Sequence, residues 1–359
     1  MSVLYDSEPE DLIDFLVHNG NGVKGLSQLN LKQIPSQFIQ PPDQRHSHIQ
    51  VSTQKSIPTI DVSQWADTNT AQSICEAATT WGFFQIVNHG IPPEVMENVK
   101  RASHDFFGLP VEERRKYLKE NSPTQSVMLK TSFSPLAEKV LEWKDYLVHL
   151  VGTEIDGADF ALWPSVTRGP VSEYINRVKP IIRKLLETLL NGINVTQIDE
   201  AKESALMGTL LTTLLHYPKC PNPELAAGAG PHSDISSLTI LLQDDVGGLY
   251  VRLSGTTDEW AHVTPVDGSL VVNIGDVLEI MSNGRYKSVE HRVFVDGRRD
   301  RVSVPVFVNP SANAVIGPLP EVMEDGEKPM YRRLVYSDYF GYFFSKGHDG
   351  KRTIDFARV

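Results

Sequence analysis

The stretch that sets the fold runs from Gly208 to Leu253 and reads GTLLTTLLHYPKCPNPELAAGAGPHSDISSLTILLQDDVGGLYVRL. Apolar and β-branched runs alternate there with Gly, Pro, Asn and Asp, and the same texture continues to Val308. The strand-like runs are Leu210–Tyr217, Leu238–Gln243, Leu249–Leu253, Trp260–Val263, Leu270–Ile274, Val277–Met281, Val289–Val295 and Arg301–Val308. Short strands separated by turn residues predict a β-sandwich or closed barrel, and a double-sheet jelly roll is the form we expect.

Helical patterns flank this β-rich part. Val171–Leu190 carries apolar residues at a regular three–four spacing, which predicts a long helix that backs a sheet. Tyr331–Phe344 predicts an aromatic C-terminal helix laid across the barrel. Upstream, Ala71–Thr80 and Glu94–Phe107 have helical spacing, whereas Ile57–Asp61 and Trp81–Gly90 read as buried strands. The expected class is therefore α+β, a double-stranded β-helix core with surrounding helices.

This pattern predicts four regions along the 359 residues. Residues 1–56 form a lead-in that lies on the body, and 57–205 a helix-rich region. Residues 206–312 form the jelly-roll core and 313–359 a C-terminal helical extension.

The composition of the chain limits the classes of protein to which it can belong. The chain has 40% hydrophobic and 22% charged residues, which is ordinary for a globular protein in water. The net charge of −11 argues against nucleic acid as a partner. Neither of the two cysteines sits in a CxxC pair, so a reducing compartment is expected. The first twenty residues are acidic and no apolar run is long enough to span a bilayer, so we expect a cytoplasmic monomer without membrane contact.

The chemical signal is the pattern His232-x-Asp234 followed by His291. Residues two apart on a strand face the same side, so His232 and Asp234 can share one metal. A later strand can bring His291 alongside them. Two imidazoles and one carboxylate leave open coordination positions, as in non-haem Fe(II) oxygenases.

Arg301 and Ser303 are also two apart. A guanidinium with a neighbouring hydroxyl suits a carboxylate held at fixed orientation. We call Arg301 and Ser303 the carboxylate clamp. A metal with open coordination positions beside this clamp can bind a keto-acid co-substrate and O₂.

Several motifs resemble the plant 2-oxoglutarate- and Fe(II)-dependent dioxygenases. They span nearly the whole chain: Ile57–Asp61, Trp81–Gly90, His232-Ser-Asp234, Asn273-Ile-Gly-Asp276, Ser282-Asn-Gly284, His291-Arg-Val293 and Arg301-Val-Ser303. Within that family, Gly22–Gly25, Thr131–Glu138 and Glu142–Tyr146 are most similar to hydroxycinnamoyl-CoA ortho-hydroxylases of the feruloyl-CoA 6′-hydroxylase type. Coumarin 8-hydroxylases share part of the pattern, including His348-Asp-Gly-Lys351.

The resemblance implies roles residue by residue. The iron ligands fall on His232, Asp234 and His291, and the 2-oxoglutarate contacts on Arg301, Ser303 and Tyr217. Phe307 falls at a position that stacks on aromatic substrates, although core packing explains it equally well. The implied cofactors are Fe(II), 2-oxoglutarate as co-substrate and O₂, with ascorbate as reductant.

Two positions depart from the family pattern. Leu215 stands where the family has an Asn that helps to orient 2-oxoglutarate, and a lost hydrogen bond of about 1 kcal/mol predicts weaker co-substrate binding. By strand alternation, His216 should face away from Tyr217 and so should not replace that Asn. Pro231 stands where near relatives have Arg, which can alter contacts to a charged substrate.

The implied substrate is a small aromatic CoA thioester, feruloyl-CoA or p-coumaroyl-CoA, leading to scopoletin or umbelliferone. Because CoA is anionic and the chain acidic, a local basic rim is required. Candidates are Lys130, Lys144, Lys287, Arg298 and Arg299, any of which could equally be a solvated surface residue, and Phe133 is a further candidate contact. Alternatives are 8-hydroxylation of a coumarin, another plant aromatic, or a cupin-like binding protein without turnover. A zinc hydrolase lacks support because no HExxH spacing occurs.

Overall fold

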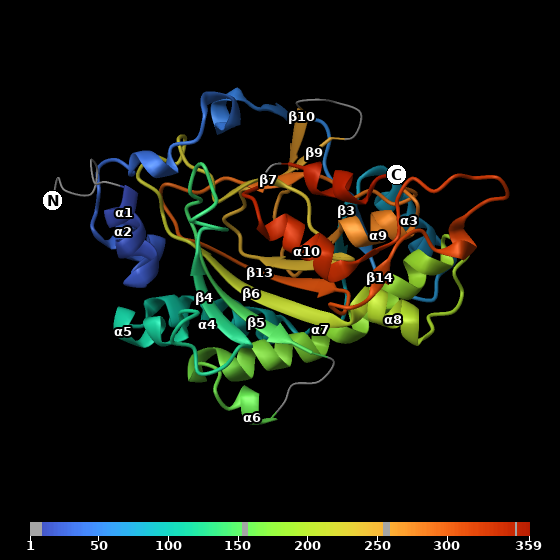
Figure 1. The fold of residues 1–359 in the computed structure, drawn as a ribbon, viewed down its shortest axis with the longest axis horizontal. Helices are drawn as coiled ribbons and strands as arrows, with labels where there is room; N and C mark the ends of the chain where they lie inside the picture. Colours follow the sequence, from blue (N-terminus) through green and yellow to red (C-terminus); the bar gives the residue numbers. More distant parts are fainter. Residues whose placement is uncertain (1–8, 153–156, 254–258, 349) are drawn as a thin grey trace.

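The computed structural model describes residues 9–152, 157–253, 259–348 and 350–359. Two sheets form a jelly roll, and helices cover the outer face of the larger one (Figure 1). Its eight strands, in spatial order, are β2 (Thr59–Asp61), β3 (Phe83–Val87), β11 (Leu270–Ile274), β8 (Leu238–Gln243), β13 (Arg301–Asn309), β6 (Thr209–Tyr217), β5 (Asp145–Val151) and β4 (Val127–Thr131). The smaller sheet has the order β1 (Gln50–Ser52), β10 (Glu259–His262), β9 (Leu249–Arg252), β12 (His291–Val293) and β7 (Ala229–His232). A short pair, β14 (Val315–Ile316) and β15 (Leu334–Val335), lies apart from both.

The helices confirm the expected mixed class. They are α1 (Pro9–Ile13), α2 (Gly22–Gln28), α3 (Thr68–Thr80), α4 (Pro93–Gly108), α5 (Val111–Arg114), α6 (Gly157–Phe160), α7 (Ser165–Asn191), α8 (Glu200–Met207), α9 (Asp276–Met281) and α10 (Tyr336–Phe344). Every apolar residue of the stripe predicted on α7, from Val171 to Leu190, is buried. These side chains share one core cluster with α3, α4 and the outward face of β13, which presents Val304, Val306 and Val308. The predicted backing helix is therefore confirmed.

Alternation along β13 directs its other residues to the inside of the jelly roll. Arg301, Ser303, Pro305 and Phe307 occupy the face opposite the core valines. Because β13 is paired on both sides, with β6 and β8, its register is fixed over its length. The strand thus holds the predicted clamp residues at defined depths between the two sheets.

Some local predictions were wrong. Val277–Met281 is helix α9 rather than a strand, because a short run that is buried on every side has no periodicity to separate the two. Val289–Val295 pairs only over His291–Val293. The helix predicted from Tyr331 begins at Tyr336, after strand β15. β4 and β5 lie within the region expected to be helix-rich and were missed.

The first residues of the chain pack closely on the body. Leu12, Leu16, Val23, Leu26 and Phe38 are buried in a second core cluster, and the Phe38 ring meets Trp143 edge-on at 5.0 Å. The boundaries predicted at residues 56, 205 and 312 stay predictions. None of the helices in the described part of the chain has the length and apolar character that crossing a bilayer needs.

One buried carboxylate fastens this N-terminal segment to β5. Asp145 accepts hydrogen bonds from the backbone N–H groups of Val23 (2.9 Å) and Lys24 (2.7 Å) and from the Thr131 hydroxyl (2.8 Å). Gly22 has a φ of +66°, and a Cβ there would lie 2.5 Å from an Asp145 oxygen. The contact therefore needs both the carboxylate and the glycine.

We expect Asp145→Ala to lower the free energy of unfolding by about 3 kcal/mol, because it leaves buried donors without an acceptor. Urea unfolding measures this change, with the exposed Asp267→Ala as the matched control. Equal stability of the two variants would contradict this role for Asp145.

Candidate functional site

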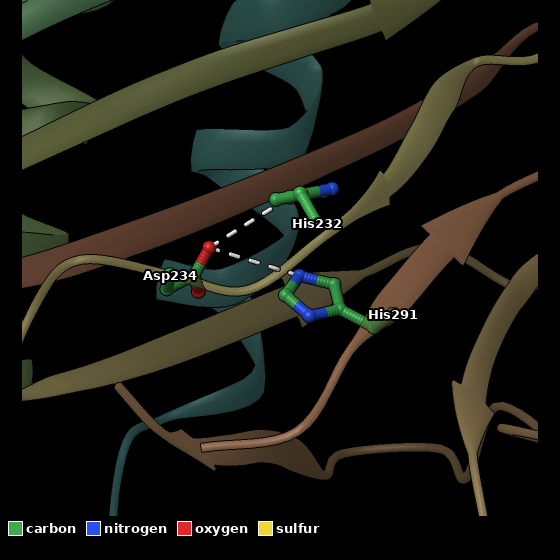
Figure 2. A group of neighbouring side chains, drawn as sticks. All are labelled: His232, Asp234 and His291. Carbon is green, nitrogen blue, oxygen red and sulfur yellow. Dashed lines mark ion pairs between the residues drawn. The ribbon is translucent and has the colours of Figure 1, made fainter. Parts of the chain in front are cut away.

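His232, Asp234 and His291 converge at one end of the smaller sheet (Figure 2). His232 ends β7 and is paired directly with His291, the first residue of β12. Each histidine Nε2 lies 3.7 Å from Asp234 Oδ1. Asp234 itself lies two residues beyond the end of β7, so the expectation that it shares the strand with His232 was wrong. The three ligand atoms nevertheless lie within 4.8 Å of one another.

Backbone carbonyls fix the histidine tautomers. His232 Nδ1 lies 2.8 Å from the Gly230 carbonyl oxygen, and His291 Nδ1 lies 3.3 Å from that of Val289. Since a carbonyl only accepts, each Nδ1 carries the proton and each Nε2 keeps its lone pair. Burial, helped by the charges of neighbouring histidines, holds the pKa of His232 well below its ordinary value. The imidazole is therefore neutral, the form that binds a metal.

Two hydrogen bonds to one oxygen fix the orientation of the Asp234 carboxylate. Asp234 Oδ2 accepts hydrogen bonds from Thr239 Oγ1 (2.6 Å) and Asn273 Nδ2 (2.9 Å), which leaves Oδ1 facing the two imidazoles. Thr239 and Asn273 were not predicted as site residues. The Asn273-Ile-Gly-Asp276 motif was the available signal for one of them.

This donor set fits a divalent transition metal. The 3.7 Å separations are too long for hydrogen bonds, and three lone-pair donors face one another in a mostly buried place. Side chains at this spacing are placed to share one cation. Two imidazoles and one carboxylate suit iron, with further positions left open.

Arg301 is a second group whose surroundings indicate a bound ligand. Its side chain is buried, with Nε 2.5 Å from the Gly247 carbonyl oxygen, Nη1 3.0 Å from Ser303 Oγ and Nη2 3.2 Å from Gln243 Oε1. The guanidinium carbon lies 4.9 Å from the centroid of the Tyr217 ring. In the described part of the chain, no carboxylate forms an ion pair with Arg301. A buried, unpaired guanidinium beside a hydroxyl fits an incoming carboxylate.

The neighbours on β6 follow the predicted alternation. Tyr217 pairs with Arg301, and Leu215 pairs with Ser303, so the departure at Leu215 lies beside the clamp. His216 faces the other way, with Nε2 3.2 Å from Asp300 and its ring stacked on Phe107. The expectation that His216 does not replace the missing Asn side chain is confirmed.

The residues predicted to contact the substrate differ in their burial and in their neighbours. Phe307 is partly exposed on the inner face of β13. Phe133 stacks on His348 and Phe344. Lys130 is partly buried above Phe344, and burial together with Lys119 lowers its pKa.

Lys144 is not part of a solvent-facing rim, and that expectation was wrong. Its Nζ lies 2.6 Å from Glu142 Oε2, and the side chain is 6% exposed. A bend at Trp143, in which the Lys144 N–H donates to the Glu142 carbonyl (2.9 Å), brings the two partners together. Among the other candidates, Arg299 is exposed and paired with Asp245, and Lys287 and Arg298 are exposed.

Comparison with known proteins agrees with this geometry. Residues 209–310 match the 2OG-Fe(II) oxygenase superfamily, and residues 57–165 match the N-terminal region of non-haem dioxygenases in morphine synthesis. Feruloyl CoA ortho-hydroxylase 1 of Arabidopsis thaliana is 53% identical over 98% of this chain and 97% of its own. A bi-functional coumaroyl CoA and feruloyl CoA ortho-hydroxylase of Ipomoea batatas is 54% identical over 97% of each chain.

Solved structures agree as well. The crystal structure of JOX2 in complex with 2OG, Fe and JA is 32% identical, with a TM-score of 0.76 over 94% of this chain and 97% of that one. The rice dioxygenase for auxin oxidation, at 24% identity and a TM-score of 0.70 over 84% of this chain and 100% of its own, shares the fold.

We expect Thr239→Val to weaken Mn²⁺ binding by about 10-fold, because residues that orient a metal ligand contribute on that scale. Isothermal titration of the metal-free protein measures the affinity, and Thr196→Val on an exposed loop is the control. Unchanged affinity in Thr239→Val would show that Asp234 needs no such support.

Proposed function

The chain belongs to the 2OG-Fe(II) oxygenase superfamily and is a 2-oxoglutarate-dependent non-haem iron dioxygenase, and on that premise we propose that it hydroxylates hydroxycinnamoyl-CoA thioesters ortho to the propenoyl chain. The substrates are feruloyl-CoA, p-coumaroyl-CoA or both. The observation that carries the proposal is similarity along the whole chain to feruloyl CoA ortho-hydroxylases, at 53% identity for the Arabidopsis protein.

We assign the metal to His232 Nε2, His291 Nε2 and Asp234 Oδ1. When bound, Fe(II) with 2-oxoglutarate and O₂ supplies the oxidising power for ring hydroxylation, at the expense of decarboxylating the keto acid to succinate. Thr239 and Asn273 keep Asp234 Oδ1 turned toward the metal position.

We assign the distal carboxylate of 2-oxoglutarate to Arg301 and Ser303, with the Tyr217 hydroxyl as a further donor. The guanidinium is already anchored through Gly247 and Gln243, so little side-chain entropy is lost when the carboxylate binds. Phe307 lies further along the same inner face, where an aromatic ring can stack on the substrate.

The product of ring hydroxylation carries a phenol beside the propenoyl thioester. After trans-to-cis isomerisation, the phenolic oxygen can attack the thioester carbonyl carbon. The carbon–sulfur bond then breaks, and CoA leaves as the thiol with the phenolic proton. Feruloyl-CoA gives scopoletin by this route, and p-coumaroyl-CoA gives umbelliferone.

An anionic CoA substrate requires a cation, and two of the predicted lysines, Lys130 and Lys144, differ in their pairing. Lys130 is partly buried and pairs with no carboxylate in the described ranges, whereas Lys144 is neutralised by Glu142. We therefore propose Lys130, next to Phe133 and Phe344, as the cation that meets the anionic part of the thioester. A monomer in the cytoplasm is the setting that we propose for this activity.

We expect succinate and scopoletin or umbelliferone from feruloyl-CoA or p-coumaroyl-CoA, and no product from free ferulate or from scopoletin. The assay is aerobic incubation with Fe(II), 2-oxoglutarate and ascorbate, followed by mass spectrometry. Asp234→Ala is the control without turnover. Conversion of scopoletin with the thioesters left intact would replace this substrate with a coumarin.

We expect Leu215→Asn to lower the KM for 2-oxoglutarate about fivefold, because one added hydrogen bond contributes about 1 kcal/mol beside the clamp. Steady-state succinate formation measures the change, with kcat held as the internal comparison. Leu211→Asn, on the same strand but further from Arg301, is the matched control. A KM that does not fall would show that Leu215 leaves no unmet contact.

A further inference from the structure

The segment that follows α10 lies against the predicted metal site. The Gly350 N–H donates to the Pro231 carbonyl (2.9 Å), and Gly350 forms a parallel bridge with His232. The Lys351 ammonium contacts the Glu279 carboxylate and the Ser288 carbonyl. This C-terminal strap, residues 346–348 with 350 and 351, is thus attached close to both predicted histidine ligands.

His348 of the strap stacks on the His232 ring. The centroids lie 4.2 Å apart and the planes differ by 5°. Phe133 stacks on His348 as well, at 3.9 Å and 27°. Because two rings cannot share one face at these distances, His348 is held between Phe133 and His232.

A buried carboxylate joins His348 to the backbone that orients His232. Glu142 Oε1 lies 2.7 Å from His348 Nδ1 and accepts the Gly230 N–H at 2.5 Å. The Gly230 carbonyl in turn accepts the His232 Nδ1 proton. Glu142 Oε2 pairs with Lys144, and only 3% of the Glu142 side chain is exposed. The Glu142 carboxylate therefore links His348 to Gly230, whose carbonyl orients the His232 ring.

A histidine ligand needs such restraint. The torsion between Cβ and an imidazole ring is broad, so one hydrogen bond from Nδ1 leaves the ring free to tilt about it. A flat group packed on the ring face removes that freedom. We infer that His348 is a positioning residue that fixes the His232 ring so that Nε2 faces the metal, which makes the C-terminal strap part of the metal site.

His348 does not itself ligate the metal. Among the described residues, the group of ligand atoms within 4.8 Å of one another comes from His232, Asp234 and His291, and His348 is not part of it. The inference rests on the proposed role of His232 as a ligand, which the experiment tests separately.

The test measures Co²⁺ binding by the metal-free protein. Titration gives the affinity, and visible absorption reports the coordination geometry of the bound Co²⁺. We expect His348→Ala to weaken Co²⁺ binding by about 10- to 100-fold and to change the spectrum. His348→Phe keeps a flat ring in the stack. We expect its Co²⁺ affinity to stay within about threefold of that of the parent protein, a much smaller loss than the one expected for His348→Ala. Thermal unfolding of the metal-free variants separates this effect from loss of fold.

His262→Ala removes a partly exposed histidine of the smaller sheet and is the matched control. If His348→Ala does not fold, His348→Leu takes its place, since leucine keeps bulk without a flat ring. Parent-like Co²⁺ affinity and spectrum in His348→Ala or His348→Leu would overturn the inference, as would His348→Phe binding as weakly as His348→Ala. If the parent protein binds Co²⁺ no better than His232→Ala, the proposed metal site fails instead.

Discussion

The antiparallel pairing of His232 with His291 is the constraint on which the rest of the site depends. It sets two imidazoles side by side at the ends of β7 and β12, with both Nδ1 protons donated to backbone carbonyls. Asp234 then completes the group from a short loop, and Thr239 and Asn273 determine which of its oxygens faces the imidazoles. A one-residue slip in this register would turn one histidine to the opposite side of the sheet and abolish the cluster.

Two polar groups between the sheets are suited to binding ligands. Three lone-pair donors face one another at His232, Asp234 and His291, and the Arg301 guanidinium is buried without an ion-pairing carboxylate in the described part of the chain. Desolvating such groups is costly unless a partner arrives. We assign Fe(II) to the first group and the distal carboxylate of 2-oxoglutarate to the second, so the polar groups that are costly to bury are those that would bind the cofactors. The hydrophobic contacts between α7 and the outer face of the larger sheet provide the stability that this requires.

Much of this could be predicted from the sequence. The periodicity of α7 and the alternation along β6 and β13 are local patterns, and each predicted which side chains face inward. Arg301 and Ser303 lie on the same face of β13, as alternation predicted. The metal residues were identified from the spacing of His232, Asp234 and His291 and not from a strand pattern, because β7 was not among the predicted runs and Asp234 lies beyond its end. Helix α9 was mistaken for a strand because its run is short and buried all round. Lys144 was mistaken for a rim cation because its pairing with Glu142 depends on burial, which residue type alone does not reveal. The stacking of His348 on His232 joins positions far apart in the chain and has no local signal.

The most direct test of the central claim is a crystal structure grown without oxygen in the presence of Fe(II) and 2-oxoglutarate, with anomalous diffraction at the iron edge. We predict one iron peak between His232, Asp234 and His291, and the distal carboxylate of 2-oxoglutarate on Arg301 and Ser303. Iron bound elsewhere, or a co-substrate carboxylate that leaves Arg301 unpaired, would contradict the account.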